Sequence, residues 1–472
     1  MNYRNPGLRI FRLEILNNSF SGYIIIVLLA YFCHAAAPVY AQEQPPTRVV
    51  TERPFASINV TSWLPEPLNV SPDNKHLIQM GYRQFVIIDG KPYGRLYDNI
   101  STPVFSADGK RRAYAAELSN KQFMVIDGIE DKRYDMIMEE SIAFSPDGKR
   151  SAYAAKQGGK WFMVIDGQEG TRYDGIGIPV FSLNSNRVAY AAELGESQFA
   201  VVDGKEGDRY DEVGTPVFSP DSDRIAYAAS MTDKWFMVVN GREQKIYDGV
   251  GAPIFSPDSK RLAYIAQLDE KQFIVMGGKA GNYYDSVSNP VFSSYNNRMA
   301  YIAQSSDRQF AIVDNRAEAS YDAIGEESLK FSPNGKHTAY TAHINDKWVM
   351  VVDGKAGKRY DGISEDFVFS SDGNKIAYVA QVGDRMSVIL DGKEGKRYDD
   401  LAENSLTFSP DGRHLAYSAC IGDRWFVVLD GKEGRKYTDI ITSGKIFFSS
   451  NSNFRYLAQR GNLLYMVEER IK

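Results

Sequence analysis

Residues 253–291 read PIFSPDSKRLAYIAQLDEKQFIVMGGKAGNYYDSVSNPV. The stretch predicts four short strands, at 253–256, 261–266, 272–276 and in the segment that ends at Tyr284-Asp285. Pro257-Asp258-Ser259-Lys260 has turn chemistry, and Gly277-Gly278, which is Asp-Gly in most other copies, favours a tight hairpin because glycine accepts positive φ. We therefore expect this stretch to fold as a four-stranded antiparallel sheet.

The same unit repeats along the chain with a period of about 37–40 residues. Its Phe-Ser anchor recurs at Phe105, Phe144, Phe181, Phe218, Phe255, Phe292, Phe331, Phe369, Phe408 and Phe448, with Val70 in a degenerate first copy. No unit has the length or the 3.6-residue periodicity of a helical repeat. A β-solenoid remains the alternative, but its coils are usually shorter and do not reverse direction at Asp-Gly hairpins. Four-stranded units of this length predict an all-β protein, a β-propeller of about 10–11 blades in one large ring or two rings.

The predicted domain organisation has three parts. Residues 1–41 are expected to be a signal peptide, residues 42–54 a short linker, and residues 55–472 the propeller repeats. The apolar segment 55–60 precedes the first unit, while the last unit lacks a fourth strand, so the two ends are expected to share one blade. The connectors between units lengthen from Asp322 onward, which indicates a weak boundary near residue 325.

The N-terminus predicts export to the periplasm or the exterior. Three arginines precede an apolar run of about 15 residues that ends at Val39-Tyr40-Ala41, a pattern typical of a cleaved signal. An uncleaved membrane anchor is the alternative, although the run is shorter than the ~20 residues that span a bilayer. Without residues 1–41, the chain has 52 basic and 59 acidic residues, a net charge of −7, and only Cys420 as a cysteine. We therefore expect no membrane span after cleavage, no nucleic-acid partner and no internal disulfide.

The unit resembles the TolB-like, WD-repeat-like propeller repeat of exported bacterial proteins. The motif stands at Phe144-Ser145-Pro146-Asp147-Gly148-Lys149-Arg150, followed by Ala152-Tyr153, and recurs from Phe408 to Tyr417. The resemblance covers about residues 64–467 and implies the blade rather than an activity. The α/β domain that precedes the propeller in TolB-like proteins is not expected here, because only residues 42–54 separate the signal from the first strand.

Few residues point to catalysis. The chain has no Gly-X-Ser-X-Gly motif, and three of its histidines, His76, His337 and His414, stand at or beside the basic position that follows the first turn of the unit. The repeated Tyr-Asp aspartates are expected to lie on one rim and to cap turns, since copies in equivalent environments cannot divide acid and base roles. The expectation is a non-enzyme without cofactor or metal site.

One position of the unit varies between Gln and Trp and usually follows a basic residue. Four of the five tryptophans occupy it, and with their neighbours they make the candidate ligand-binding set: Trp161, Trp235, Trp348, Trp425, Lys160, Lys234, Lys347 and Arg424. Indole rings beside cations suit sugars or acidic peptides. The alternative is that the tryptophans pack between blades and the lysines are merely solvated.

These observations predict a non-enzymatic exported propeller that binds or scaffolds a protein or polysaccharide partner at the cell envelope. The alternative is a glycan hydrolase or lyase with its site at the centre of the propeller. That alternative needs unique polar residues that break the repeat, and the sequence offers few.

Overall fold

A computed structural model describes residues 48–57, 69–70, 77–80, 86–88, 91–93, 95–441 and 446–472. The predicted signal peptide and His76 lie outside these ranges. The chain divides into two units, Met1–Pro46 and Thr47–Lys472, and all described residues belong to the second. Every named element there is a strand, and no helix in the described part of the chain has the length and apolarity to cross a membrane.

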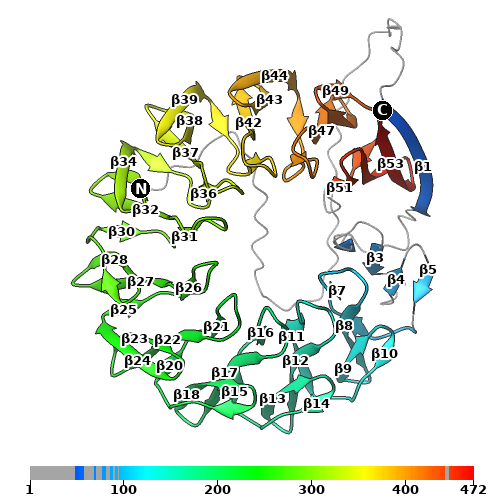
Figure 1. The fold of residues 1–472 in the computed structure, drawn as a ribbon. Helices are drawn as coiled ribbons and strands as arrows, with labels where there is room; N and C mark the ends of the chain where they lie inside the picture. The colour runs from blue at the N-terminus through cyan, green and yellow to red at the C-terminus, as the bar shows by residue number, and fades with distance from the viewer. Residues whose placement is uncertain are drawn as a thin grey trace, which may run out of the picture. The chain divides into compact units, whose positions relative to one another are not determined.

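The described strands form eleven antiparallel sheets, which follow one another in chain order around one ring (Figure 1). Each sheet is one propeller blade, so the predicted all-β propeller fold is confirmed. We number the blades 1–11 from β2 onward and count strands outward from the centre of the ring.

The first strand is short and usually split in two. Its pieces are β2 (Asn69–Val70), β6 (Asn99–Ile100), β7 (Val104–Phe105), β11 (Met136–Phe144, unsplit), β15 (Gly175–Ile176), β16 (Val180–Phe181), β20 (Glu212–Val213), β21 (Val217–Phe218), β25 (Gly249–Val250), β26 (Ile254–Phe255), β30 (Ser286–Val287), β31 (Val291–Phe292), β35 (Ala323–Ile324), β36 (Lys330–Phe331), β40 (Gly362–Ile363), β41 (Val368–Phe369), β45 (Asp400–Leu401), β46 (Thr407–Phe408), β50 (Asp439–Ile440) and β51 (Phe447–Ser450).

The second and third strands form the long central hairpin of each blade. The second strands are β3 (Leu77–Met80), β8 (Arg112–Leu118), β12 (Ser151–Gln157), β17 (Val188–Leu194), β22 (Ile225–Met231), β27 (Leu262–Leu268), β32 (Met299–Ser305), β37 (Thr338–Ile344), β42 (Ile376–Val382), β47 (Leu415–Ile421) and β52 (Asn453–Arg460). The third strands are β4 (Val86–Ile88), β9 (Lys121–Ile126), β13 (Lys160–Ile165), β18 (Ser197–Val202), β23 (Lys234–Val239), β28 (Lys271–Met276), β33 (Arg308–Val313), β38 (Lys347–Val352), β43 (Arg385–Leu390), β48 (Arg424–Leu429) and β53 (Leu463–Ile471).

The fourth strand is the outer edge of the blade. These strands are β5 (Lys91–Tyr93), β10 (Ile129–Glu130), β14 (Gln168–Glu169), β19 (Lys205–Glu206), β24 (Arg242–Tyr247), β29 (Lys279–Ala280), β34 (Arg316–Tyr321), β39 (Lys355–Tyr360), β44 (Lys393–Tyr398), β49 (Lys432–Glu433) and β1 (Arg48–Ser57).

The Ala-Tyr pattern of the second strand explains how blades stack. Tyr264 of blade 6 packs in one cluster with Ala226 and Met237 of blade 5, whereas its neighbour Ala263 packs with Tyr301 of blade 7. Each blade thus presents a large ring on one face and a small residue on the other, and the ring of one blade fills the space left by the alanine of the preceding blade. Both faces are buried, which is why the strand reads as a continuous apolar run.

The boundary between blades falls inside the Tyr-Asp pair. Tyr284 bridges Gln272 of its own blade, but the amide of Asp285 donates to the carbonyl of Gln304 in the next blade. The sequence interpretation placed both residues on the fourth strand. The aspartate instead begins the next blade, because the chain must cross to the centre of the ring at this point.

The two ends of the ring share blade 11. Strand β1 pairs antiparallel with β53 along its length, from Arg48 opposite Ile471 to Ser57 opposite Leu463. This is the closure expected from the sequence, although the N-terminal strand begins at Arg48 rather than at Phe55. Arg48 is 6% exposed and its Nε lies 2.8 Å from Glu469 Oε2, so a buried ion pair joins the two strands.

Candidate functional site

Antiparallel strands place two sets of turns on opposite rims. The crossover rim holds the turns between second and third strands and the aspartates of the Tyr-Asp pairs, where the chain crosses to the next blade. The hairpin rim holds the turns between first and second strands and the Asp-Gly turns. All eight predicted site residues lie on the crossover rim, at the start of the third strands β13, β23, β38 and β48.

The four tryptophans are half-buried, as are the Gln and Met residues at the same position in the other described copies. The backbone of each tryptophan pairs with that of the tyrosine at the end of the fourth strand, as Trp235 does with Tyr247. Trp161, Trp348 and Trp425 also pack on the clusters between blades. This position is therefore partly open to water.

Polar or small residues of the second strand stand opposite the tryptophans on this rim. The cross-strand partners of Trp161, Trp235, Trp348 and Trp425 are Lys156, Ser230, His343 and Cys420. Lys156 Nζ lies 5.3 Å from the ring centre of Trp161, and the His343 and Trp348 rings meet edge-on with centres 5.3 Å apart. Lys156 and His343 were not among the predicted site residues, because their place beside an indole depends on strand register.

The basic residues before the tryptophans have a structural use. Lys160, Lys234 and Lys347 each bind the aspartate that begins the next blade, with Nζ–Oδ1 distances of 2.5, 2.6 and 2.5 Å. The same ion pair occurs in Lys121–Asp135, Lys271–Asp285, Arg308–Asp322 and Arg385–Asp399. These lysines therefore join neighbouring blades. Arg424 differs because Thr438 replaces the aspartate, and its nearest carboxylate is Asp423 at 3.6 Å.

The second oxygen of each aspartate caps a turn. Asp135 Oδ2 accepts the Gly158 amide at 2.7 Å, and the corresponding bond recurs at every described Tyr-Asp aspartate from Asp98 to Asp399. Hydrogen bonds from Lys121 Nζ and the Gly158 amide lower the pKa of Asp135 below its usual range. The capping role inferred from the sequence is confirmed, and the structure adds the ion pair to the preceding blade.

Glutamine at the tryptophan position makes a different bond between blades. Gln122 Oε1 accepts the backbone amide of Ile137 in the next blade at 2.7 Å, and Gln198, Gln272 and Gln309 make the same bond at the same spacing. A glutamine at this half-buried position therefore has a partner for its amide. Tryptophan cannot accept such a bond, since its indole nitrogen is only a donor.

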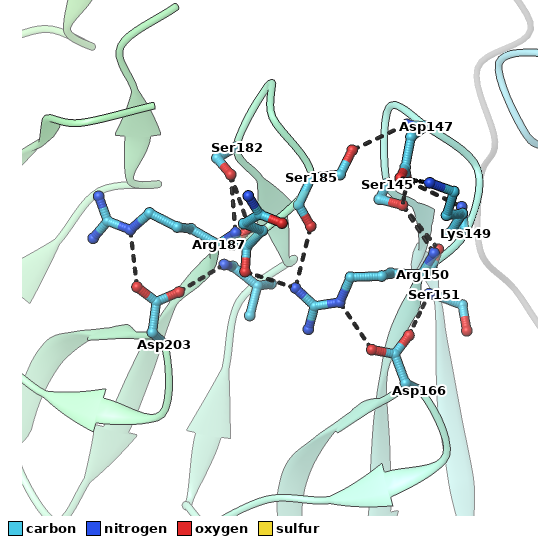
Figure 2. A network of polar contacts seen from close by, with 12 residues as sticks. Ser145, Asp147, Lys149, Arg150, Ser151, Asp166, Ser182, Ser185, Arg187 and Asp203 are labelled. Carbon is cyan, nitrogen blue, oxygen red and sulfur yellow. Dashed lines mark hydrogen bonds and ion pairs between the residues drawn. The ribbon is translucent and has the colours of Figure 1, made fainter. Parts of the chain in front are cut away.

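The hairpin rim is held by arginines that reach into the next blade. Arg150 Nε pairs with Asp166 Oδ2 at 2.9 Å, and its Nη1 donates to the carbonyl of Asn186 in the next blade at 2.9 Å (Figure 2). The guanidinium also lies 5.4 Å from the ring centre of Phe181. Equivalent contacts to the phenylalanine of the next blade are made by Arg111, Arg187, Arg224, Arg261 and Arg298.

Histidine replaces this arginine in two later blades. His337 Nδ1 lies 2.7 Å from Asp353 Oδ2, and His414 Nδ1 lies 2.6 Å from Asp430 Oδ2. The predicted place of both histidines at the basic position is therefore confirmed. Among the described residues, no group of three or more His, Cys, Asp or Glu side chains is arranged to hold a metal ion.

A groove of about 380 Å³ opens on the hairpin-rim side between blades 2 and 3. Arg111, Asp127, Ile129 and Asp166 are among its lining residues. Arg111 and Asp127 form an ion pair at 2.8 Å there, so the charged lining of the groove is already engaged within the protein.

Comparison with known proteins gives similarities of shape. No family model and no curated protein matches the sequence. Similar solved structures include a eukaryotic initiation factor, with 10% identity, TM-score 0.40 and coverage of 76% of this chain and 98% of that chain. The β-propeller domain of the Trilobed protease from Pyrococcus furiosus has 14% identity, TM-score 0.30 and coverage of 63% and 94%. TolB from Acinetobacter baumannii has 17% identity, TM-score 0.21 and coverage of 60% and 64%.

Proposed function

We propose that this chain is a non-enzymatic, exported β-propeller that binds a protein or polysaccharide partner of the cell envelope through its crossover rim. The observation that carries the proposal is the shared position of Trp161, Trp235, Trp348 and Trp425. All four are half-buried on one rim, and Trp161, Trp348 and Trp425 also pack on the clusters between blades.

A half-buried indole is suited to binding because it is rigid before the partner arrives. Tryptophan gives a large contact area with only two side-chain torsions to order, and its face stacks on sugars and on the apolar parts of peptides. Interface residues of this type often contribute 2 kcal/mol or more. The hairpin rim offers less, since its repeated arginines pair with aspartates of their own blade and donate to carbonyls of the next blade.

The ion pairs change the role expected of the lysines. Because Lys160, Lys234 and Lys347 bind aspartates of the next blade, they do not supply free charge for an acidic ligand. The partner in this proposal is therefore bound by stacking, with Lys156 and His343 as polar neighbours of two of the indoles.

The test is a variant with all four tryptophans changed to glutamine, the residue that other copies carry. Partners of the wild-type chain are captured from an envelope extract and screened on a glycan array, and their affinity is then measured for the variant. We expect binding to fall at least 30-fold, since the loss of about 2 kcal/mol at a single contact already has that effect.

The control variant changes Lys149, Lys260, Lys336 and Arg413 on the hairpin rim to glutamine, and it should bind as the wild type does. Unchanged affinity in the folded tryptophan variant would place the ligand elsewhere. Export is tested in the same preparation, because cleavage after Ala41 predicts an envelope form that begins at Gln42, whereas an intact N-terminus would indicate an anchor.

A further inference from the structure

One junction of the crossover rim lacks the cation found at its neighbours. Blade 4 has Ser197 where seven other described blades have the lysine or arginine that binds the aspartate of the next blade. Asp211, which begins blade 5, is exposed and still caps its turn through a 2.7 Å bond from the Thr232 amide to Oδ2. Within the described part of the chain, no salt bridge reaches its other oxygen.

The same substitution uncovers two apolar side chains. Leu194 stands opposite Ser197 across the hairpin, and Met231 lies between Ser230 and Thr232, whose backbone groups bind Asp211. Leu194 is 40% exposed and Met231 is 46% exposed. Both residues end the second strand of their blade. In other blades the apolar residue that ends this strand is half-buried when the third strands of its own and of the preceding blade both begin with a basic residue, as at Leu268, Ile344, Val382 and Ile421.

Both effects have one cause. A lysine buries its aliphatic stem along apolar surface while its ammonium stays at the polar end. Replacing it by serine removes the stem that would neighbour Leu194 and Met231 and the charge that would bind Asp211. What remains has the chemistry of a receptor for a lysine or arginine side chain.

We infer that the Ser197 junction, formed by Leu194, Ser197, Asp211 and Met231, binds a lysine or arginine side chain of a protein partner. The stem of that side chain lies along Leu194 and Met231, and its cationic group binds Asp211, as the protein's own lysines do at 2.5–2.6 Å at neighbouring junctions. Exposed Glu196, Glu212 and Asp233 in the adjoining segments add negative potential that attracts a basic segment.

The inference rests on the proposed function, because it adds one contact to the proposed binding face. Trp235 lies on the same hairpin as Met231, one residue after Lys234, which is paired with Met231. A partner that inserts a basic side chain at the Ser197 junction therefore also passes close to one of the four indoles.

The test uses a random peptide library displayed on phage and selected on the full wild-type chain. We expect the selected peptides to be enriched in lysine or arginine. Their dissociation constants should rise at least tenfold on the S197K variant, which fills the junction from within, and on D211N. Replacing the enriched lysine by norleucine, or the arginine by citrulline, should have the same effect. The matched controls are S294K, which adds the charge on the hairpin rim, and D307N, which removes an exposed charge elsewhere on the crossover rim.

The outcomes separate this inference from the proposed function. Loss of binding on S197K with binding retained by the four-tryptophan variant supports the junction and contradicts the indole face. Loss of binding on both S197K and the four-tryptophan variant supports both the Ser197 junction and the indole face. Peptides without basic residues, or equal binding to wild type and S197K, would overturn the inference whatever the tryptophan variant does. S197K should also melt at a higher temperature than wild type, by an amount that D211N removes, which shows that the introduced lysine occupies the junction.

Discussion

Gln and Trp exchange at one half-buried position because each solves a different problem there. Glutamine bonds to the backbone amide fifteen residues later in the next blade, as Gln198 does with Val213 at 2.9 Å. Tryptophan fills the same space with apolar surface and leaves part of its ring in water. The two residues are therefore interchangeable for folding but not for contact with a partner.

Trp235→Gln tests this at the level of one residue. The new side chain can accept the amide of Val250, the residue at the corresponding spacing, which offsets the lost apolar burial. We expect the free energy of unfolding in urea to change by less than about 1 kcal/mol, since a typical net hydrogen bond is worth that much. Trp235→Ala, which loses the ring without gaining the bond, should cost about 3 kcal/mol, within the usual range for tryptophan truncation. Equal losses in both variants would contradict the proposed exchange.

The candidate site shows what a sequence can and cannot reveal about single residues. The shared position of the tryptophans and its partial exposure follow from the repeat, because equivalent positions meet equivalent environments. The ion pair of Lys160 with Asp174 was not predicted, although the two residues are fourteen apart in each copy that has the pair. The pair is recognised only once the blade boundary is placed between Tyr and Asp.

At the level of elements, the sequence predicted that β1 is a strand but not where it begins. The apolar pattern indicates a strand only from Phe55, while the first residues of β1 include Arg48, Glu52 and Arg53. Arg48 is nonetheless buried, because Glu469 on β53 neutralises it at 2.8 Å and Tyr456 donates a 2.6 Å bond to the same carboxylate. In the sequence, the charged residues of a buried ion pair look the same as charged residues on the surface, so the hydrophobic pattern does not reveal that they are buried.

The Arg48–Glu469 pair should decide how firmly β1 holds the last blade. Glu469→Ala leaves a guanidinium that is 6% exposed without its charge partner, and we expect a loss of about 3–5 kcal/mol in the free energy of unfolding. Denaturation in urea measures it. The control replaces the set with apolar residues, Arg48→Met, Tyr456→Phe and Glu469→Leu, and should recover most of the stability. A loss below about 1 kcal/mol in Glu469→Ala would mean that β1 does not unfold together with the rest of the blade.

At the level of the whole molecule, carboxylates make repeated polar contacts on both rims. On the crossover rim, aspartates bind a lysine or arginine of the preceding blade, and on the hairpin rim, aspartates such as Asp147 and Asp372 accept a bond from a serine of their own turn. Hydrogen bonds from Ser145 and the Lys149 amide lower the pKa of Asp147 to about 2, and bonds from Ser370 and the Asn374 amide do the same for Asp372. The protein therefore repeats acid-sensitive contacts, between blades on the crossover rim and within turns on the hairpin rim.

The pH dependence of stability should follow from this repetition. Each lowered pKa gives stability that is present above the unfolded value near 4 and is lost as the pH falls toward about 2. Carboxylates with raised pKa, such as the buried Glu469 and the half-buried Asp439, act in the opposite direction. In the described part of the chain, thirteen carboxylates have lowered pKa values and five have raised ones, so the net effect is loss of stability in acid.

We therefore expect the urea midpoint to be nearly constant from pH 7 to pH 5 and to fall steeply between pH 4 and pH 2.5. Changing four crossover-rim aspartates to asparagine, Asp135, Asp174, Asp248 and Asp361, should lower the urea midpoint at pH 7. The midpoint of this variant should also fall less between pH 4 and pH 2.5, because these groups no longer take up protons on unfolding. A control with four other exposed acids, Asp307, Asp346, Asp384 and Glu403, changed to the corresponding amides should keep the wild-type profile. If the junction variant keeps the full acid dependence, the lysine–aspartate pairs do not hold the ring together, and its stability comes from packing between the Ala-Tyr faces alone.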